Sequence, residues 1–559
     1  MLSRNSQYKK KLRGWLSYAF ASEVFVIVSL TLFLPICLEQ FARDNGYLMP
    51  DKVLPCSSLK PTTIAGKASS SDEARCVVKF GWFWIDSASF SLYVYSISVA
   101  LQAITVVSMG GIADHPPHRK RLLLGFALLG SSAATTFLLL PSSSPVWYLS
   151  ALLAMCANVA FGASTVAMNA YIPSLAREAP EVMKVVQALD TFEDISTVRT
   201  PLDPEASAES AAEPLLSPSP EDLSRKTELD TEYQAELSRA TSRISSLGIA
   251  LGYGAGIFML FVALIPVTRL HGSTFSLRLA IGLSGIWWAI FTVPAALWLP
   301  SVNVRNRVSN GAVSRGQMDD DKNWSLGREI AAAWIRLINM LRWKEISKLR
   351  NTFKYLAAWF LLSDGFTTIT STAVLFGKTT LHMSPSALIL VGILTPTSGI
   401  LGSLIWPVFQ RKLGWSNLRI LVVLVLLASI IPVYGCLGFI IQGRASFGGL
   451  TTQEEMFGLA IYFGSVYGAF QGYARAFYAE LIPPGEEARW YGLFSITDKS
   501  SSFIGPLVVG VISDLTGNIR YSFFFLVFMI WLAVPILISV NVEKGRQDAA
   551  EYEYGHESS

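Results

Sequence analysis

Long apolar runs alternate with polar segments along almost the whole chain. Most of these runs reach the length at which a helix crosses the hydrocarbon core of a bilayer, about 20 residues. The pattern therefore predicts membrane-spanning helices rather than the short amphipathic elements of a soluble domain. The expected spans are 15–38, 89–113, 121–140, 146–172, 244–266, 277–300, 352–376, 386–409, 418–441, 456–481, 490–513 and 520–542.

The composition agrees with this reading. Of the 559 residues, 51% are hydrophobic and 15% are charged, and the mean hydropathy is +0.42. Soluble domains rarely combine so much apolar sequence with so few charges. The first span is too long for the apolar core of a signal peptide, contains Glu23 and is not followed by a small-x-small cleavage site. The sequence predicts an all-α polytopic membrane protein.

The placement of charge predicts the orientation of the chain. The net charge of +4 is uninformative, but the short basic segments "YKKKLR", "HRKR" and "QRKLGWSNLR" all fall on one side of the predicted spans. Short basic loops remain on the cytosolic side of a membrane. We therefore expect both termini to face the cytosol.

Two polar segments interrupt the succession of spans. Residues 173–243 are rich in Pro, Ser, Ala and acidic residues, a composition that buries too little apolar surface to fold, and we expect a disordered cytosolic loop. Residues 301–351 end in "GREIAAAWIRLINMLRWKEISKLR", which predicts an amphipathic helix along the cytosolic membrane face. The predicted parts are a tail (1–14), a six-helix bundle (15–300), a linker (301–351), a second six-helix bundle (352–542) and a tail (543–559).

Short words recur in the same order in the two halves. "ASEVF" in span one matches "LSDGF" in span seven, and the end of span two matches that of span eight through Gly110 and Gly402. "YIPS" after span four matches "LIPP" after span ten. Each match alone is weak, but three in the right order indicate two related six-helix halves.

The loop after span two reads "GGIADHPPHRK". It resembles the Gly-x-x-x-Asp…Arg-Lys loop of the major facilitator superfamily, although Pro-Pro-His replaces the usual glycine before the basic cluster. The resemblance implies conformational gating: Gly110 would allow close helix approach, and Asp114 would pair with basic residues near Arg119 or with a helix end. The alternative is that Asp114 is simply solvated at the membrane edge.

Glu23 and Asp364 each lie about midway along a predicted span. A charge at the bilayer centre costs about 2.5–3.5 kcal/mol even on the lenient insertion scale. Each carboxylate must therefore face water, pair with a cation or hold a proton. Matching positions in the two halves favour a substrate or coupling role in a central cavity, and a structural hydrogen bond to a neighbouring helix is the alternative.

Arg475 is the one arginine well inside a predicted span, and its guanidinium suits a substrate carboxylate, Glu23 or Asp364. The sequence leaves substrate binding and structural pairing open for this residue. Four further polar side chains are candidates for the cavity wall, with packing as the alternative for each: Gln471, Asn158, Asn169 and Tyr467.

Cysteine and histidine usage limits the chemistry. Cys56 and Cys76 share the first predicted outside loop, where a disulfide is one of two open expectations. The five histidines are scattered and form no metal-binding motif, so we expect neither a metal nor another cofactor, and no nucleic-acid partner.

The opening segment "GWLSYAFASEVFVIVSLTLFLPICLEQFARDNG" and the closing segment "YAELIPPGEEARWYGLFSITDKSSSFIGPLVVGVISDLTGNIRYSFFFL" resemble the fungal autophagy-related protein 22 family. These are vacuolar members of the major facilitator superfamily. The resemblance implies a transporter in the vacuole membrane, not an enzyme, that exports leucine, isoleucine, tyrosine and similar amino acids to the cytosol after autophagic breakdown. Coupling to protons would follow if a buried carboxylate takes part.

Two alternatives remain at this stage. A non-transporting membrane factor or lipase for the breakdown of autophagic bodies would favour a Gly-x-Ser-x-Gly motif, which the sequence lacks. A transporter of a lipid-like or organic-ion substrate would share the same fold.

Overall fold

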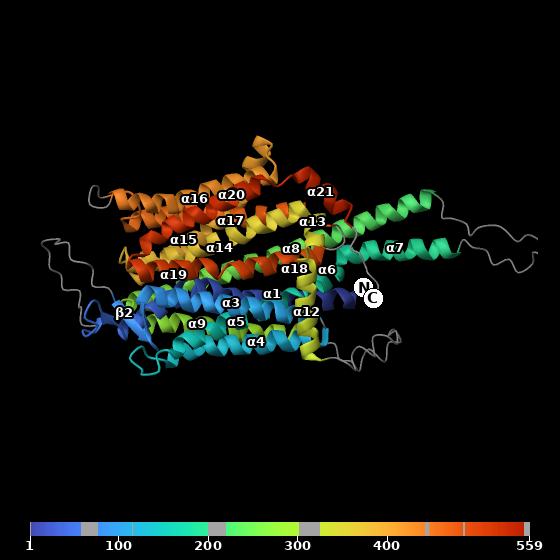
Figure 1. Cartoon of the computed structure of the whole chain (residues 1–559). Helices are drawn as coiled ribbons and strands as arrows, with labels where there is room; N and C mark the ends of the chain where they lie inside the picture. The colour runs from blue at the N-terminus through green and yellow to red at the C-terminus, as the bar shows by residue number, and fades with distance from the viewer. Residues whose placement is uncertain are drawn as a thin grey trace, which may run out of the picture.

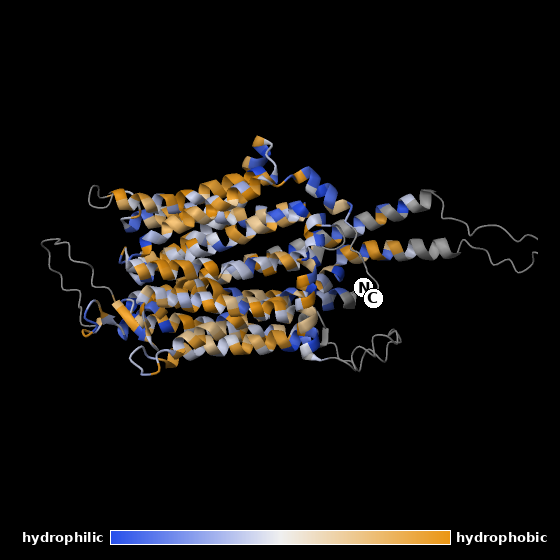
Figure 2. Ribbon diagram, viewed as in Figure 1, coloured by the Kyte–Doolittle hydropathy of each residue, from blue (hydrophilic) through white to orange (hydrophobic). Residues whose placement is uncertain are grey.

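The computed structural model describes residues 2–56, 76–114, 116–198, 220–300, 325–441, 447–483 and 487–552. Long helices lie side by side in one bundle, and both ends of the chain lie at the same end of it (Figure 1). We call that end the terminal side, and we call the opposite end, which carries the small sheet and a disulfide, the disulfide side. Apolar residues dominate the middle of the bundle, and hydrophilic ones gather toward its ends (Figure 2).

The N-terminal half begins with one long span in three parts, in which a π-helix joins two α-helices. Each half then runs up and down between the two sides. The elements of this half are α1 (Leu2–Val24), η1 (Phe25–Phe33), α2 (Leu34–Asp44), α3 (Ser87–Asp114), α4 (Pro116–Thr136), η3 (Phe137–Leu139), α5 (Leu149–Asn169), α6 (Ile172–Arg177), α7 (Pro180–Val198), α8 (Pro220–Arg269) and α9 (Thr274–Trp298).

The C-terminal half follows a short linker and ends in a helix on the terminal side. The linker and this half comprise α12 (Leu326–Met340), α13 (Trp343–Lys348), α14 (Arg350–Thr379), α15 (Pro385–Leu413), α16 (Asn417–Ile441), α17 (Gln453–Ala479), α18 (Glu487–Ser501), α19 (Ile504–Thr516), η4 (Ile519–Tyr521), α20 (Ser522–Ile538) and α21 (Val542–Ala550).

In the described part of the chain, ten helices are long and apolar enough to cross a membrane. The other two predicted spans are α17, which packs along α15, and the pair α18–α19, which is broken after Ser501. The apolar stretch of α17 is diluted by Gly, Tyr, Ser and Gln residues, and α18 and α19 are each too short to span a bilayer alone. Glycines bring α15 and α17 close, because a Cβ at Gly399 would contact the backbone of Gly464.

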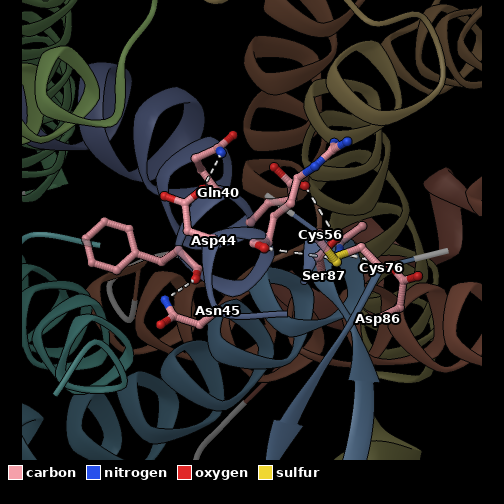
Figure 3. The surroundings of a disulfide bond; sticks show 11 residues. Gln40, Asp44, Asn45, Cys56, Cys76, Asp86 and Ser87 are labelled. Atoms are coloured by element: carbon pink, nitrogen blue, oxygen red, sulfur yellow. Dashed lines mark hydrogen bonds between the residues drawn. A yellow bond between two sulfur atoms is a disulfide. The ribbon is translucent and has the colours of Figure 1, made fainter. Parts of the chain in front are cut away.

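The loop between α2 and α3 folds as a small antiparallel sheet on the disulfide side. Its strands β1 (Tyr47–Leu48), β2 (Cys76–Phe80) and β3 (Phe83–Asp86) pair in that order. A disulfide joins Cys56 to Cys76, with their Cα atoms 6.0 Å apart (Figure 3). The sheet was not predicted, because its short apolar words are embedded in a long polar loop.

The prediction of a disordered loop over 173–243 was wrong for the described parts of that segment. Helices α6 and α7 and the first half of α8 occupy it, and α7 and α8 extend beyond the bundle (Figure 1). Val182 of α7 is buried, and Arg243 Nη1 lies 3.1 Å from Glu181 Oε1. The Pro- and Ser-rich stretch that carried the prediction, 199–219, lies outside the described residues.

The linker contains the expected amphipathic helix as α12. In Figure 1 it crosses the terminal side of the bundle at a steep angle to the spans. It packs against α3, where Trp334 Nε1 donates to Ser108 Oγ at 3.2 Å. Residues 301–324 of the predicted linker lie outside the described residues.

Candidate functional site

Glu23 lies at the end of α1, two residues before the π-helix η1 begins. Its side chain is partly exposed and packs against α8, where a Cβ at Gly252 would collide with Glu23 Cβ and Cγ. Within the described ranges Glu23 makes no hydrogen bond or ion pair. The glycine therefore makes room for a carboxylate that has no direct partner.

Two cations of the other half act electrostatically on Glu23. They are Lys499 of α18 and Arg475 of α17. Arg475 is exposed, and the Lys499 side chain is 44% exposed and lies 3.3 Å from Asp498 Oδ2. Exposure of these charges inside the bundle requires water, because a dry charge there would be expensive. Charges of opposite sign from the two halves thus lie within electrostatic range of each other.

Tyrosines from both halves surround these charges. Tyr253 of α8 lies within electrostatic reach of Glu23 and Arg475. Tyr467 of α17 accepts a hydrogen bond from Gln471 Nε2 at 2.8 Å and lies within electrostatic reach of Tyr253 and of Tyr95 in α3. The predicted residues Tyr467 and Gln471 therefore form one wall of the same region as Glu23.

Asp364 occupies a different environment from Glu23. It is 0% exposed, and its Oδ1 accepts a hydrogen bond from the Gly505 N–H at 2.9 Å. Gly505 is the second residue of α19, so the carboxylate caps the positive end of that helix. Its other oxygen, Oδ2, has no partner within the described part of the chain.

Ser363, the residue before Asp364, bonds to α18 on the other side of the helix break. Ser363 Oγ donates to Asp498 Oδ1 at 2.5 Å, and Asp498 belongs to the last turns of α18. The Ser363–Asp364 pair thus bridges the gap between α18 and α19. Discontinuous spans of this kind recur at the midplane sites of transporters.

Within the described ranges, neither predicted asparagine bonds to Glu23, Arg475 or Lys499. Asn158 is buried, donates to Ser98 Oγ at 2.7 Å and accepts a hydrogen bond from Gln102 Nε2 at 3.2 Å. These contacts fasten α5 to α3, which is the packing role that the sequence had left open. Asn169 is exposed at the terminal-side end of α5.

The predicted gating loop shows one clear departure. Among the described residues, no atom lies within 4 Å of a Cβ built at Gly110, so this glycine does not bring two described helices into close contact. Its counterpart Gly402 does, because a Cβ there would collide with the Ser465 backbone. Arg119 lies over the Tyr171 ring, 5.0 Å from its centre. The side chain of Asp114 lies outside the described residues.

The two halves are fastened together on the disulfide side. Lys378 Nζ of α14 lies 2.5 Å from Glu39 Oε2 of α2, and both side chains are largely buried. Asp514 of α19 accepts hydrogen bonds from the Asp86 N–H at 2.8 Å and from Tyr93 Oη at 3.4 Å. We call these five residues the outer gate.

Two further bonds extend the outer gate toward the centre. Ser89 Oγ donates to the Gly510 carbonyl and Ser96 Oγ to the Phe503 carbonyl, at 3.0 and 2.7 Å. These bonds join the halves on the disulfide side of the bundle centre. The described bonds therefore hold the two halves together on the disulfide side of the central charges.

The sequence alone did not identify the outer gate or two tyrosines of the N-terminal half, Tyr95 and Tyr253. Glu39 and Lys378 lie near span ends, where charges are normally solvated and carry no signal of pairing. Tyr95 and Tyr253 look like ordinary aromatic residues of a span. From its sequence position near the start of a predicted span, Lys499 is expected to pair locally or to reach for the membrane interface.

Comparison with known proteins decides the family. Residues 7–550 match the family described as "Vacuole effluxer Atg22 like". The chain belongs to this family. Autophagy-related protein 22 of Cryptococcus neoformans is 41% identical over 575 residues, covering 97% of this chain and 96% of the relative. Autophagy-related protein 22-1 of Neosartorya fischeri is 39% identical over 569 residues, covering 97% and 91%.

Solved structures show the same fold. The inward-open xylose transporter XylE of E. coli superposes with a TM-score of 0.50 at 10% identity, covering 96% of each chain. The nucleoside transporter NupG gives 0.51 at 12% identity, covering 96% of this chain and 99% of NupG. The fold is that of the major facilitator superfamily, and the family makes this chain a multi-pass membrane transporter of autophagy at the vacuole.

The outer gate predicts the effect of Lys378→Met. Removing one partner of a buried ion pair costs about 3–5 kcal/mol, and here the loss falls on the closed disulfide side. With Ser89→Cys as reporter, a membrane-impermeant maleimide added from the disulfide side should label the Lys378→Met protein at least about tenfold faster.

Lys354→Met is the matched control, because Lys354 lies at the other end of the same helix and donates to the Ser539 carbonyl. It should leave the labelling rate unchanged. Equal labelling of Ser89→Cys with and without Lys378→Met would mean that the ion pair does not hold the halves together.

Proposed function

We propose that the chain exports amino acids, including leucine, isoleucine and tyrosine, from the vacuole to the cytosol by alternating access. The terminal side faces the cytosol and the disulfide side faces the lumen. Basic short loops on the terminal side support this orientation, and a disulfide suits an oxidising lumen. The outer gate is then the lumenal gate, and it is closed in the described conformation.

The observation that carries the proposal is the opposition of charge across the boundary between the halves. Glu23 belongs to one half, and Arg475 and Lys499 belong to the other. A zwitterionic amino acid offers an ammonium to the first and a carboxylate to the second. Because the ligand satisfies both halves together, its binding favours the state in which they approach each other.

The surrounding side chains suit the remainder of such a ligand. Tyr253 and Tyr467 lie within electrostatic range of charged residues of this region, and the Phe366 ring centre lies 5.3 Å from that of Tyr467. Apolar and aromatic substrate side chains pack favourably on such surfaces. The preference for large neutral amino acids follows from this chemistry.

Helix α19 supplies a route for proton coupling. Asp364 holds one end of it through Gly505, and Asp514 holds the other end to the N-terminal half at the outer gate. A protonated carboxyl accepts a hydrogen bond more weakly than a carboxylate does. Proton uptake by Asp364 from the acidic lumen would loosen α19 and the gate, and proton loss to the cytosol would restore both.

The substrate assignment is tested in liposomes with radiolabelled leucine. Glu23→Gln and Arg475→Gln each remove one charge-assisted contact, worth about 1.5–3 kcal/mol, so uptake at low leucine should fall roughly 10- to 100-fold. Glu178→Gln is the control, because Glu178 forms a surface ion pair with Lys11. Wild-type uptake in both central variants would remove these charges from substrate binding, and absent leucine uptake by the wild type would reject the substrate class.

The coupling role is tested separately with Asp364→Asn. The amide oxygen still accepts the Gly505 hydrogen bond but cannot exchange a proton. We expect leucine exchange between equal pools to persist, while stimulation of uptake by an imposed pH gradient is lost. The titratable neighbours Asp498 and Tyr95 remain in this variant. An undiminished response to the gradient in Asp364→Asn would exclude Asp364 as the coupling group.

A further inference from the structure

The linker carries an apolar surface that the bundle does not cover. Met340 is buried against the bundle and Leu337 packs on it, while Ile335 and Ile338 of the same helix are 56% and 59% exposed. Beyond the end of α12, Trp343 is 81% exposed. Large apolar side chains are therefore exposed both on α12 and at the start of α13 (Trp343–Lys348).

Exposed cations surround this surface. Between Ser325 and Arg350 the chain has six basic and two acidic residues, and all six basic side chains are exposed. Of the acidic residues, Glu345 already bonds Lys348 and Tyr552 at 3.2 and 2.6 Å. Four of the cations make no hydrogen bond or ion pair within the described ranges: Arg328, Arg336, Arg342 and Lys344.

The position of α12 relative to the spans matches the edge of a bilayer. Its Trp334 bonds to Ser108, six residues before α3 ends at Asp114. At 1.5 Å per residue this contact lies about 9 Å inside the end of the span. Helix α12 therefore lies near the end of a span, where a bilayer edge is expected. The following helix begins with Trp343 between Arg342 and Lys344, and a tryptophan flanked by cations is typical of a membrane interface, with the ring among acyl carbons and the cations at the headgroups.

We propose that the α12–α13 surface, formed by Arg328, Ile335, Arg336, Ile338, Arg342, Trp343 and Lys344, binds the headgroups of anionic phospholipids on the terminal-side leaflet. Four unpaired cations beside a single exposed apolar strip complement anionic headgroups above acyl chains. An acidic protein segment would satisfy the cations but leave Ile335, Ile338 and Trp343 without an apolar environment. The inference is independent of the substrate.

The surface has a mechanical consequence. Helix α12 contacts α3 of the N-terminal half, and α13 leads directly into α14 of the C-terminal half. Lipid bound at α12 would hold the linker at the membrane edge while the halves move. The bilayer composition on the terminal side would then influence the transporter without contacting its central site.

The test uses the full chain in nanodiscs of phosphatidylcholine that contain either brominated phosphatidylserine or brominated phosphatidylcholine. Bromine quenches nearby tryptophan, and the emission of Trp343 is isolated from that of the chain's 15 tryptophans by subtracting the Trp343→Phe spectrum. We expect Trp343 to be quenched at least about twofold more strongly by the serine lipid, and this preference to fade at high salt.

Two multiple variants distinguish an effect of the α12–α13 surface from an effect of the protein's overall positive charge. Arg328→Gln, Arg336→Gln, Arg342→Gln and Lys344→Gln together should abolish the preference while quenching by the choline lipid remains. The matched control removes four exposed cations of other terminal-side segments and should retain it: Lys9→Gln, Lys10→Gln, Lys184→Gln and Lys412→Gln.

Three results would overturn the proposal. Equal quenching by both lipids in the wild type would make this an ordinary lipid contact. Absence of quenching by either lipid would place Trp343 in water or under a protein partner. If the fourfold linker variant keeps the preference for the serine lipid, the anionic-lipid site lies at other residues. The salt dependence of the wild type decides the matter even if the fourfold variant fails to fold.

Discussion

The attraction between Glu23 in one half and Arg475 and Lys499 in the other is the interaction on which the rest of this account depends. Charges in the middle of a membrane bundle are costly unless they are paired or reach water. Here Glu23 is partly exposed, and Arg475 and Lys499 lie within electrostatic range of it across the boundary at which the two halves must separate. The arrangement therefore both requires an opening and gives it a chemistry suited to a zwitterion, which is why we propose an amino-acid substrate.

The remainder of the structure closes the boundary between the halves on the disulfide side. The outer gate closes the disulfide side through one buried ion pair and a row of hydrogen bonds to α19, whereas the terminal side is spanned by the linker. Helix α19 is short because the span breaks after Ser501, and each end of it is held by a carboxylate, Asp364 or Asp514. Helix α19 therefore connects the neighbourhood of Asp364 to the outer gate. We propose that the position of α19 shifts the equilibrium between two states of the transporter, one with the outer gate closed and one with it open.

Much of the fold could be predicted from the sequence, because apolar length and repeated words report directly on membrane spans and on two related halves. The site was only partly predictable. Glu23 was recognised by the cost of burying a charge, but the same reasoning placed Asp364 beside it, although the structure uses Asp364 to cap α19. Pairings such as Glu39 with Lys378 join residues far apart in sequence, so no local pattern reports them. The helices within 173–243 were missed because composition was averaged over a segment whose flanks differ from its centre.

A double-mutant cycle on leucine binding tests the central claim most directly. The affinity of the purified protein is measured calorimetrically for the wild type, Glu23→Gln, Arg475→Gln and the double variant. If one zwitterion bridges the two charges, the losses are strongly non-additive, and the double variant binds about as weakly as either single variant. If the free-energy losses simply add, the two residues do not share a ligand, and the proposed bridging of the halves is wrong.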